Sequence, residues 1–464
     1  MSTQAAAELF REVPGDEPED VLFNSIYGLR TIELNRPAQL NSLNGSMVRK
    51  IAPRLLEWQK SDMANVIVMK GAGPKALCAG GDVKALAQAN ETGEEGQKWS
   101  TDYFGLEYKL DHLIATYQKP YIAFMDGITM GGGVGLSVHA PIRIATERTM
   151  FAMPETTIGF FPDVGASFFL PRMAGETGTY LALTSDRLKG ANVFYSGIAT
   201  HYLHSTSLPN LESRLAELRF KDYDSMEQRL RVIDATIEEF CTGLPHDEPM
   251  MLAGELRKAI DRCFSHDNVP AILNALEEEM KSGDAAVGQW AEKTIKTLHE
   301  RSPTAVHVTL RQMRISKKWS IAETFKREHQ IAAKFMRHHD FTEGVSALLI
   351  RKPKAAPQWQ PPSLEAIKPE DNVSEPFFQP SADVESLDLL NQSDYSEYPY
   401  RHFLGLPSEK DIEKVVMGGT MRPGEVVKHF VDEKRVKQGV KEVVQEVLAR
   451  KTEVNDDGKA VWQY

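Results

Sequence analysis

The sequence predicts an α/β protein that ends in a mostly helical region, and three observations support this fold class. Short β-branched runs alternate with helical patterns over residues 21–200. From about residue 205 the apolar residues follow helical spacing almost throughout, and signals for strands largely cease. The 464 residues are 42% apolar, which is enough for a sizeable core and for more than one domain.

The elements of the α/β core follow one another in a clear order. Residues 21–27 and 29–34 flank Gly28 and predict a β-hairpin. Apolar residues at helical spacing then predict a helix over 47–58. Three further β-branched runs predict buried strands, at residues 66–69, 121–125 and 142–145.

The chain divides into four predicted segments. An acidic stretch rich in Pro and Gly marks residues 1–20 as a flexible N-terminal tail. The α/β core spans residues 21–205, and a helical region over 206–365 completes it. A Pro-rich break at 352–362 leads into residues 366–464, which we predict to be a linker or wrapping segment followed by a helical C-terminal extension.

The extension is expected to end in two helices. Ser408 and Asp411 form a capping-box pattern for a helix that Gly418 can end, and a valine stripe from Val436 to Leu448 marks a second, amphipathic helix. Basic residues flank the stripe and could dock on an acidic partner such as RNA. They are Lys434, Arg435, Lys437, Lys441, Arg450 and Lys451. A valine stripe more often packs on its own domain, and interspersed acidic residues dilute this basic charge.

Composition argues against several classes of function. The formal net charge of −11 argues against a dominant nucleic-acid surface and against a DNA partner. No apolar run approaches the roughly 18–20 residues that cross a membrane. The three cysteines, Cys78, Cys241 and Cys263, form neither a disulfide framework nor a metal knuckle, which favours a reducing compartment. No cluster of histidines completes a tetrahedral ligand set, so we expect no metal.

Two glycine-rich turns are the first candidates for chemistry. Gly80 and Gly81, and then residues 131–135, each lie between a predicted strand and a predicted helix. Glycines at such places expose backbone N–H groups, and two such turns together can polarise one carbonyl as an oxyanion hole. Tight turns and close packing of a helix on a strand use the same glycines, so either turn taken alone can be purely structural. Neither turn matches a P-loop or a complete GxGxxG motif, which argues against nucleoside triphosphates and dinucleotides.

Two carboxylates in the apolar, Pro-bounded segment 151–163 are the second candidate. Apolar surroundings disfavour an ionised Glu155 or Asp163 unless the group is paired or functional. A carboxylate beside a polarised carbonyl can act as a general base toward water, or attack the carbonyl to form an anhydride. An N-cap Asp and a solvated Glu are the structural alternatives. We therefore predict a site for acyl transfer or enolate chemistry.

These motifs resemble those of the crotonase (enoyl-CoA hydratase/isomerase) superfamily, and within it the 3-hydroxyisobutyryl-CoA hydrolase family. The resemblance is carried by residues 126–139 and 151–172, and it extends over roughly residues 20–362. It implies a spiral of repeated β-β-α units that binds acyl-CoA thioesters. The reaction it implies is hydrolysis of 3-hydroxyisobutyryl-CoA or similar short 3-hydroxyacyl-CoA thioesters in valine catabolism. CoA is then part of the substrate, and no separate cofactor is implied.

The resemblance also implies roles for individual residues. The amides of Gly81 and Gly132 correspond to the oxyanion hole, Glu155 and Asp163 to the catalytic acidic pair, and Glu107 to a third acid that lines the substrate site. The remaining implied substrate contacts lie near the nucleotide part of CoA. They are Ala38, Gln39, Leu40, Ala79, Gly80 and Asp82.

The same resemblance favours hydrolysis over hydration. Hydratases of the superfamily use two glutamates, and Gly135 occupies the position of the first one here, while Asp163 stands where relatives have glycine. In the implied mechanism Glu155 activates water or forms a transient acyl-enzyme. Asp163 orients the substrate hydroxyl and assists proton transfer.

Some proteins that resemble this hydrolase are subunits of the mitochondrial small ribosomal subunit, and this is the alternative function. Residues 366–464 would then be the docking element for rRNA and ribosomal proteins. The resemblance implies a location in the mitochondrial matrix, although the N-terminus, with a single Arg at position 11, does not look like a transit peptide. Related folds occur as trimers, hexamers and smaller forms, so a homo-oligomer is possible and its size is left open.

Overall fold

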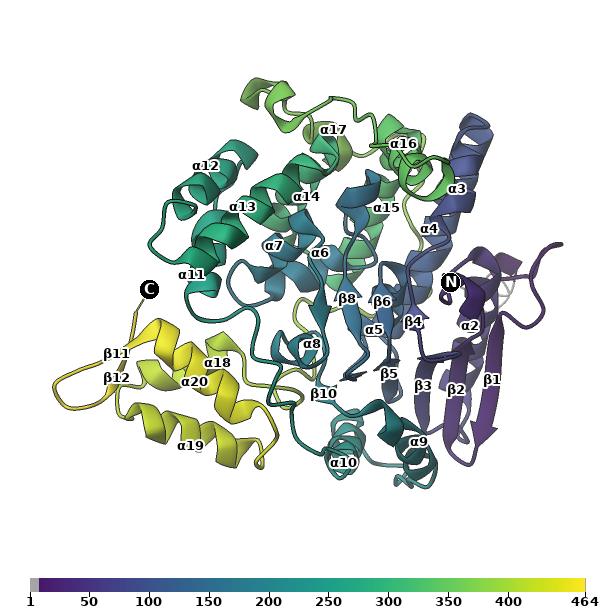
Figure 1. Ribbon diagram of the computed structural model, residues 1–464. Helices are drawn as coiled ribbons and strands as arrows, with labels where there is room; N and C mark the ends of the chain where they lie inside the picture. Colours follow the sequence, from purple (N-terminus) through teal and green to yellow (C-terminus); the bar gives the residue numbers. More distant parts are fainter. Residues whose placement is uncertain (1–7, 464) are drawn as a thin grey trace.

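The computed structural model describes residues 8–463, and its centre is a pair of β-sheets (Figure 1). The larger sheet has six strands in the order β1-β2-β3-β5-β7-β10, and the smaller has four in the order β4-β6-β8-β9. The strands are β1 Val21–Ile26, β2 Leu29–Leu34, β3 Val66–Gly71, β4 Ala76–Cys78, β5 Tyr121–Met125, β6 Ile128–Met130, β7 Ile142–Ala145, β8 Met150–Ala152, β9 Leu188–Lys189 and β10 His201–Tyr202.

Successive units of the chain place one strand in each sheet. β3, β5 and β7 are neighbours in the larger sheet, and β4, β6 and β8, which directly follow them, are neighbours in the smaller one. Both sets pair in parallel. Helices follow the strand pairs: α3 Val83–Asn90, α4 Glu94–Ala115, α5 Gly132–Val138, α6 Ala166–Phe169 and α7 Thr177–Thr184. The β-β-α repeat that the resemblance implied is therefore confirmed.

The core elements predicted from apolar spacing are also present. β1 and β2 form the antiparallel hairpin, with Val21 opposite Leu34. The helix predicted after it is α2, Gly45–Lys60, whose first turn is capped by the Asn44 side chain accepting from the Met47 amide. The three predicted buried strands are β3, β5 and β7.

The region after the α/β core is mainly helical, as predicted. Its helices are α8 Ala191–Tyr195, α9 Leu208–Ala216, α10 Met226–Glu238, α11 Gly254–Phe264, α12 Val269–Glu279, α13 Ala285–His299, α14 Pro303–Ile315, α15 Ile321–Arg337 and α16 His339–Val345. α15 packs along α4, on the side of the molecule where the green and blue helices meet in Figure 1. Among residues 8–463, no helix has both the length and the hydrophobicity of a membrane span.

The described part of the N-terminal tail lies against the core, whereas the sequence suggested a flexible segment. Phe10 is 3% exposed and belongs to the same apolar cluster as α2. Arg49 on α2 donates from Nε to Asp16 (2.8 Å), and Lys50 pairs with Asp20 (2.6 Å). The spacing of apolar residues did not reveal these contacts because they are mostly ionic. Residues 1–7 lie outside the described part.

Residues 364–406 wrap around the molecule as an extended strap, with the short helix α17 Glu375–Phe378 within it. Phe377 and Leu387 pack in the largest apolar cluster, Leu390 in a second and Leu404 in a third. Because this strap contributes to three separate clusters, it is part of the packed core rather than a free spacer.

The chain ends in a small unit with its own apolar core. It contains α18 Glu409–Met417, α19 Pro423–Glu433, α20 Val440–Lys451 and the hairpin β11 Thr452–Val454 with β12 Ala460–Trp462. The predicted capping box at Ser408 and Asp411 and the end of the helix at Gly418 are confirmed. α19 and the hairpin were not predicted. The second predicted helix begins at Val440 and not at Val436, which is 76% exposed with a φ of +61°.

Two of the six basic residues expected on a docking face are instead used internally. The Lys437 ammonium lies between Asp234 (3.1 Å) and Glu238 of α10, and its side chain is 5% exposed. The Arg450 side chain is 2% exposed and pairs with Glu409 at 2.9 Å. These two cations join the end of the chain to α10 and to α18, so the expected basic face is smaller than its sequence suggests.

Replacing Lys437 with Met should loosen the C-terminal unit from the core. The substitution leaves the Asp234 and Glu238 carboxylates without their cation, which we expect to cost about 1–3 kcal/mol of unfolding free energy. Urea unfolding measures that loss, and limited proteolysis should release a C-terminal fragment faster. Lys441→Met, at an exposed position on α20, is the matched control. Equal stability and equal proteolysis of the two variants would contradict the assigned role.

Candidate active site

Three neighbouring parallel strands of the smaller sheet end at one edge and deliver the main candidate groups there. Gly80 and Gly81 follow β4, Gly131 and Gly132 follow β6, and Glu155 follows β8 after two residues. In parallel sheets, ligands bind outside the carboxyl ends of the strands. The strand order therefore explains why glycine turns about 50 residues apart in sequence meet at one place.

The two glycine turns converge within van der Waals distance. A Cβ atom added to Gly132 would stand 3.4 Å from the Gly81 nitrogen, and one added to Gly131 would stand 3.4 Å from the Gly80 Cα. Gly131 has a φ of +45°, which favours glycine at this turn. A side chain at either position of the β6 turn would enter the space between the turns.

The amide N–H groups of Gly81 and Gly132 have no hydrogen-bond acceptor among residues 8–463. Their neighbours are engaged, since the Gly80 carbonyl accepts from Leu43 N (2.9 Å) and Asp82 N donates to Leu43 O (2.8 Å). The backbone around the two free donors is therefore held in place. Two positioned, unpaired N–H groups are what an oxyanion hole requires.

Acidic side chains lie directly beside these turns. Glu107 Oε1 is 2.6 Å from the place that a Cβ on Gly132 would take, and Glu155 Oε1 is 3.1 Å from the corresponding place on Gly131. Glu107, Glu155 and Asp163 are 2%, 4% and 4% exposed, so none is a solvated surface acid. Glu107 Oε1 and Glu155 Oε2 are buried without a partner among the described residues.

Asp163 is held by a neighbour that sequence analysis did not identify. The Tyr108 hydroxyl, one residue beyond Glu107 on α4, donates to Asp163 Oδ2 at 2.6 Å. Val164 follows with a φ of +53°, a strained conformation for a β-branched residue. His139 Nε2–H donates to Val164 O (2.9 Å), and burial lowers the pKa of His139 to about 3, which keeps it neutral.

Glu328 on α15 completes the support for this loop. Its carboxylate accepts from Gly165 N at 2.7 Å and from Ser167 N at 2.9 Å, and the side chain is fully buried. Gly165 is required here because a Cβ would lie 2.2 Å from His139 Nε2. Together Tyr108, His139 and Glu328 position Asp163.

Burial in this cluster raises the pKa of each carboxyl group. Burial and then the charge of Asp163 raise the pKa of Glu107 and of Glu155. Burial raises the pKa of Asp163 to about 7, although the Tyr108 hydrogen bond acts in the opposite direction. A group with a pKa near neutrality can both release and accept a proton during one catalytic cycle.

Sequence analysis also did not identify a fourth acid in this cluster, Asp111. It is fully buried one turn beyond Glu107 on α4, and neither carboxylate oxygen has a partner among the described residues. A Cβ on Gly135 would stand 2.7 Å from its Oδ2, so Gly135 leaves room for this side chain. The sequence offered one sign of this acid's role, since residues 107, 108 and 111 are polar and lie close together on one helix.

The structure also brings together the segments expected to contact the nucleotide part of CoA. Ala79 N donates to Leu40 O at 3.0 Å, which joins the loop of residues 38–40 to the first glycine turn. Ala38 and Gln39 are exposed, and Asp82 pairs with Arg36 at 3.2 Å. Contact of these residues with CoA stays a prediction.

One further polar cluster forms away from this site. His201, Asp234 and Glu238 place one ligand atom each within 4.8 Å of one another. The sequence did not reveal this set because His201 lies far along the chain from the two α10 residues. The Lys437 ammonium pairs with both carboxylates. The cluster is accounted for as the contact of the C-terminal unit with the core.

Comparison with known proteins agrees with this geometry. The sequence model for the enoyl-CoA hydratase/isomerase family matches residues 29–378. The chain therefore belongs to that family. A carnitinyl-CoA dehydratase from Mycobacterium thermoresistibile has the same fold with a TM-score of 0.68 and 33% identity, covering 81% of this chain and 100% of that one.

Two kinds of curated relative are similar to the chain. The small ribosomal subunit protein mS47 of Neurospora crassa is 63% identical over 452 residues, which cover 97% of this chain and 89% of that protein. The mitochondrial 3-hydroxyisobutyryl-CoA hydrolase of Danio rerio is 43% identical over 348 residues, covering 75% of this chain and 87% of that protein. The mS47 of Schizosaccharomyces pombe is 42% identical, covering 74% of this chain and 76% of that protein.

The buried carboxyl groups predict that stability falls as pH rises. Asp163 is protonated in the folded protein up to about pH 7 but ionises near its ordinary pKa of 3.8 when unfolded, so the unfolded state loses its proton first. The unfolding free energy should decline between these values by up to roughly 1.4 kcal/mol per pH unit from this group.

Asp163→Asn should make this decline shallower in urea unfolding at pH 5, 6 and 7. Asp102→Asn, an exposed position that pairs with Lys98 on α4, is the control and should leave the slope unchanged. A variant at Asp163 with the wild-type pH slope would show that this carboxyl group is ionised in the folded protein.

Proposed function

We propose that this chain is a component of the mitochondrial small ribosomal subunit that keeps a thioester-hydrolysing site. The similarity to the Neurospora crassa mS47 carries the first half of the proposal, because it covers 97% of the chain and so includes the C-terminal unit. The match to the Danio rerio hydrolase covers 75%. A mitochondrial location follows from the same proposal.

Sedimentation of the untagged, full-length protein tests the ribosomal role. In a lysate of mitochondria from cells that express it, the chain should migrate with small-subunit rRNA and persist there after a wash at raised salt. Free migration at the size of the isolated protein, with the rRNA intact, would contradict the proposal.

The second half of the proposal rests on the site geometry. Two amide donors without an acceptor among residues 8–463 and two buried carboxylates lie around one small space. We propose that the Gly81 and Gly132 N–H groups bind the thioester oxygen and that Glu155 acts on the carbonyl carbon. This arrangement stabilises the oxyanion as it forms and supplies the base or nucleophile for hydrolysis.

The proposed reaction breaks the C–S bond in one of two ways. Either Glu155 takes a proton from a water molecule that attacks the carbonyl, or its carboxylate attacks first and forms an anhydride that water then hydrolyses. In both routes the leaving thiolate receives a proton, and Asp163, with a pKa of about 7, can supply it. Label found in Glu155 after a single turnover in ¹⁸O-labelled water would establish the anhydride route, because label enters Glu155 only when water attacks the Glu155 carbonyl of an anhydride.

We propose a short 3-hydroxyacyl-CoA thioester, such as 3-hydroxyisobutyryl-CoA, as the substrate. Similarity to the mitochondrial 3-hydroxyisobutyryl-CoA hydrolases supports this choice and a role in valine catabolism. Asp163 would accept a hydrogen bond from the substrate hydroxyl. Hydration of an enoyl-CoA is disfavoured because Gly135 carries no side chain to act as the second acid.

Gly132→Ala should lower kcat for thiol release by about 10²–10³, because its Cβ would stand 2.6 Å from Glu107 Oε1 and would displace the oxyanion donor. Gly424→Ala is the matched control, since a Cβ at that helical position meets nothing within 4 Å. Thiol release from 3-hydroxyisobutyryl-CoA is the assay. Equal rates for the two variants would show that the turn is not an oxyanion hole.

Glu155→Gln should abolish most thiol release while leaving the fold intact, because the neutral amide is neither a base nor a nucleophile. The wild type should show no hydration of crotonyl-CoA in a parallel assay. Wild-type rates in the Gln variant would refute the catalytic role of Glu155. If the wild type itself releases no thiol but sediments with the ribosome, only the structural half of the proposal stands.

A further inference from the structure

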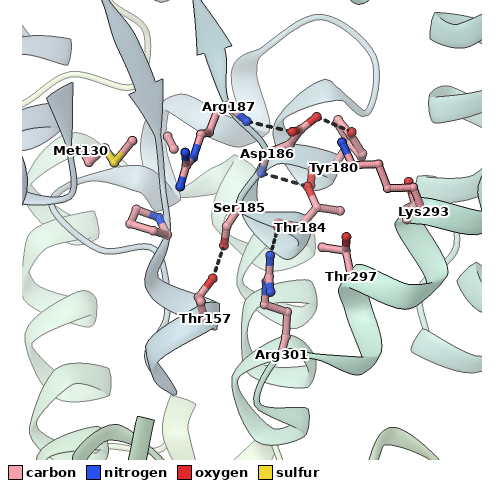
Figure 2. A pocket seen from close by; sticks show the side chains of 13 residues that line it. Met130, Thr157, Tyr180, Thr184, Ser185, Asp186, Arg187, Lys293, Thr297 and Arg301 are labelled. Carbon is pink, nitrogen blue, oxygen red and sulfur yellow. Dashed lines mark hydrogen bonds between the residues drawn. The ribbon is translucent and has the colours of Figure 1, made fainter. Parts of the chain in front are cut away.

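A cavity borders the residues that lead into Gly131 and Glu155, and the proposed hydrolysis assigns it no role. Its volume is about 370 Å³, and its lining includes Met130 and Pro154, which immediately precede Gly131 and Glu155. Other walls come from the segment 184–187, from α13 and from Arg301 in the turn between α13 and α14 (Figure 2). Cavities of this size hold small molecules in other proteins.

Three cationic side chains line this cavity. They are Arg187, Lys293 and Arg301. None forms an ion pair with a carboxylate in the described part of the chain, although many other arginines of the protein do. Figure 2 shows the Arg187 side chain between Met130 and Ser185, and the Arg301 side chain below Ser185, beside Thr184. Three cations against the single acid Asp186 leave the lining of this concave space with a net positive charge, which creates a site for an anion.

Arg301 is the best-fixed of these cations. One of its terminal nitrogens donates to Thr184 O at 2.8 Å, while its Nε is buried and has no acceptor among the described residues. A buried guanidinium N–H without a partner is costly unless a ligand or water meets it. This unpaired donor is an observation independent of the charge count.

The acidic group in the lining is already engaged. Asp186 Oδ2 accepts from the Tyr180 hydroxyl at 2.6 Å, and its Oδ1 accepts from the Arg187 amide at 2.9 Å. It therefore lies along the wall and leaves the Arg187 side chain without a hydrogen bond to the described protein. Ser185 and Thr157 add hydroxyl groups, joined to each other at 3.3 Å.

We propose that this cavity binds a small phosphorylated ligand through Arg187, Lys293 and Arg301. Guanidinium groups match phosphoryl oxygens with paired N–H donors, and the Ser185 hydroxyl, which accepts from Thr157, can donate to the same group. Three cations suit a doubly charged phosphoryl group better than a single carboxylate. A concave space of about 370 Å³ fits a small free ligand and not a duplex backbone. The ligand is either inorganic phosphate or the phosphate of a nucleoside monophosphate.

Calorimetric titration of the full-length protein with inorganic phosphate and, separately, with AMP tests this proposal. One saturable site should appear with at least one probe, and equal or tighter binding of AMP identifies the nucleotide as the source of the phosphoryl group. Arg187→Gln and Arg301→Gln should each weaken binding roughly tenfold, the loss of one charge-assisted contact. Arg54→Gln, an exposed arginine on α2 that pairs with Glu57, should leave binding unchanged.

The Arg187→Gln variant should fold normally, because the exposed Arg187 side chain has no hydrogen bond to the described protein. Arg301, by contrast, also donates to the Thr184 carbonyl, so its replacement removes a structural contact as well. The proposal is overturned if neither probe binds saturably, or if Arg187→Gln binds as the wild type does. It is also overturned if a single-stranded oligonucleotide binds while phosphate and AMP fail to compete. Thioester hydrolysis can fail without affecting any of these outcomes.

Discussion

The parallel pairing of β4, β6 and β8 is the constraint on which the candidate site depends. These three strands are short, but each follows directly on a strand of the larger sheet, so their order is set by the order of β3, β5 and β7. Parallel neighbours end at one edge, and this places the amide N–H groups of Gly81 and Gly132 and the Glu155 side chain around the same space. Any change that broke this pairing would separate the donors from the acid, even if every residue of the site were kept.

The site concentrates acidic groups where water is largely excluded, and the surrounding structure offsets the cost of doing so. Raised pKa values allow part of the cluster to stay protonated, which avoids several adjacent charges in a buried space. Backbone N–H groups also offset the cost of burial, because two of them donate to the Glu328 carboxylate. The same two hydrogen bonds hold the loop after Asp163 in place. Strain at Val164 is tolerated because His139 and Glu328 hold the peptide group that follows it.

Residues 364–463 join the two proposed roles. The strap of residues 364–406 packs in three apolar clusters, and Tyr398 of the strap hydrogen-bonds to His139 at 2.8 Å, one contact away from the loop that carries Asp163. Lys437 then fastens the terminal unit to α10. A chain built in this way can present its terminal unit to a partner while the same segment supports the site.

The sequence by itself determined the family, the β-hairpin, α2, the buried strands and the identity of the glycine turns and of Glu155 and Asp163, because apolar periodicity and local motifs encode these features. It did not indicate that Glu107 is buried, that Tyr108, Asp111, His139 and Glu328 surround the acidic pair, or that Lys437 faces inward. Only the tertiary structure decided these points, since they depend on which helix faces meet between residues far apart in sequence. Periodicity shows that a helix has two faces, but a polar residue on the buried face can be recognised only when the neighbour that buries it is known.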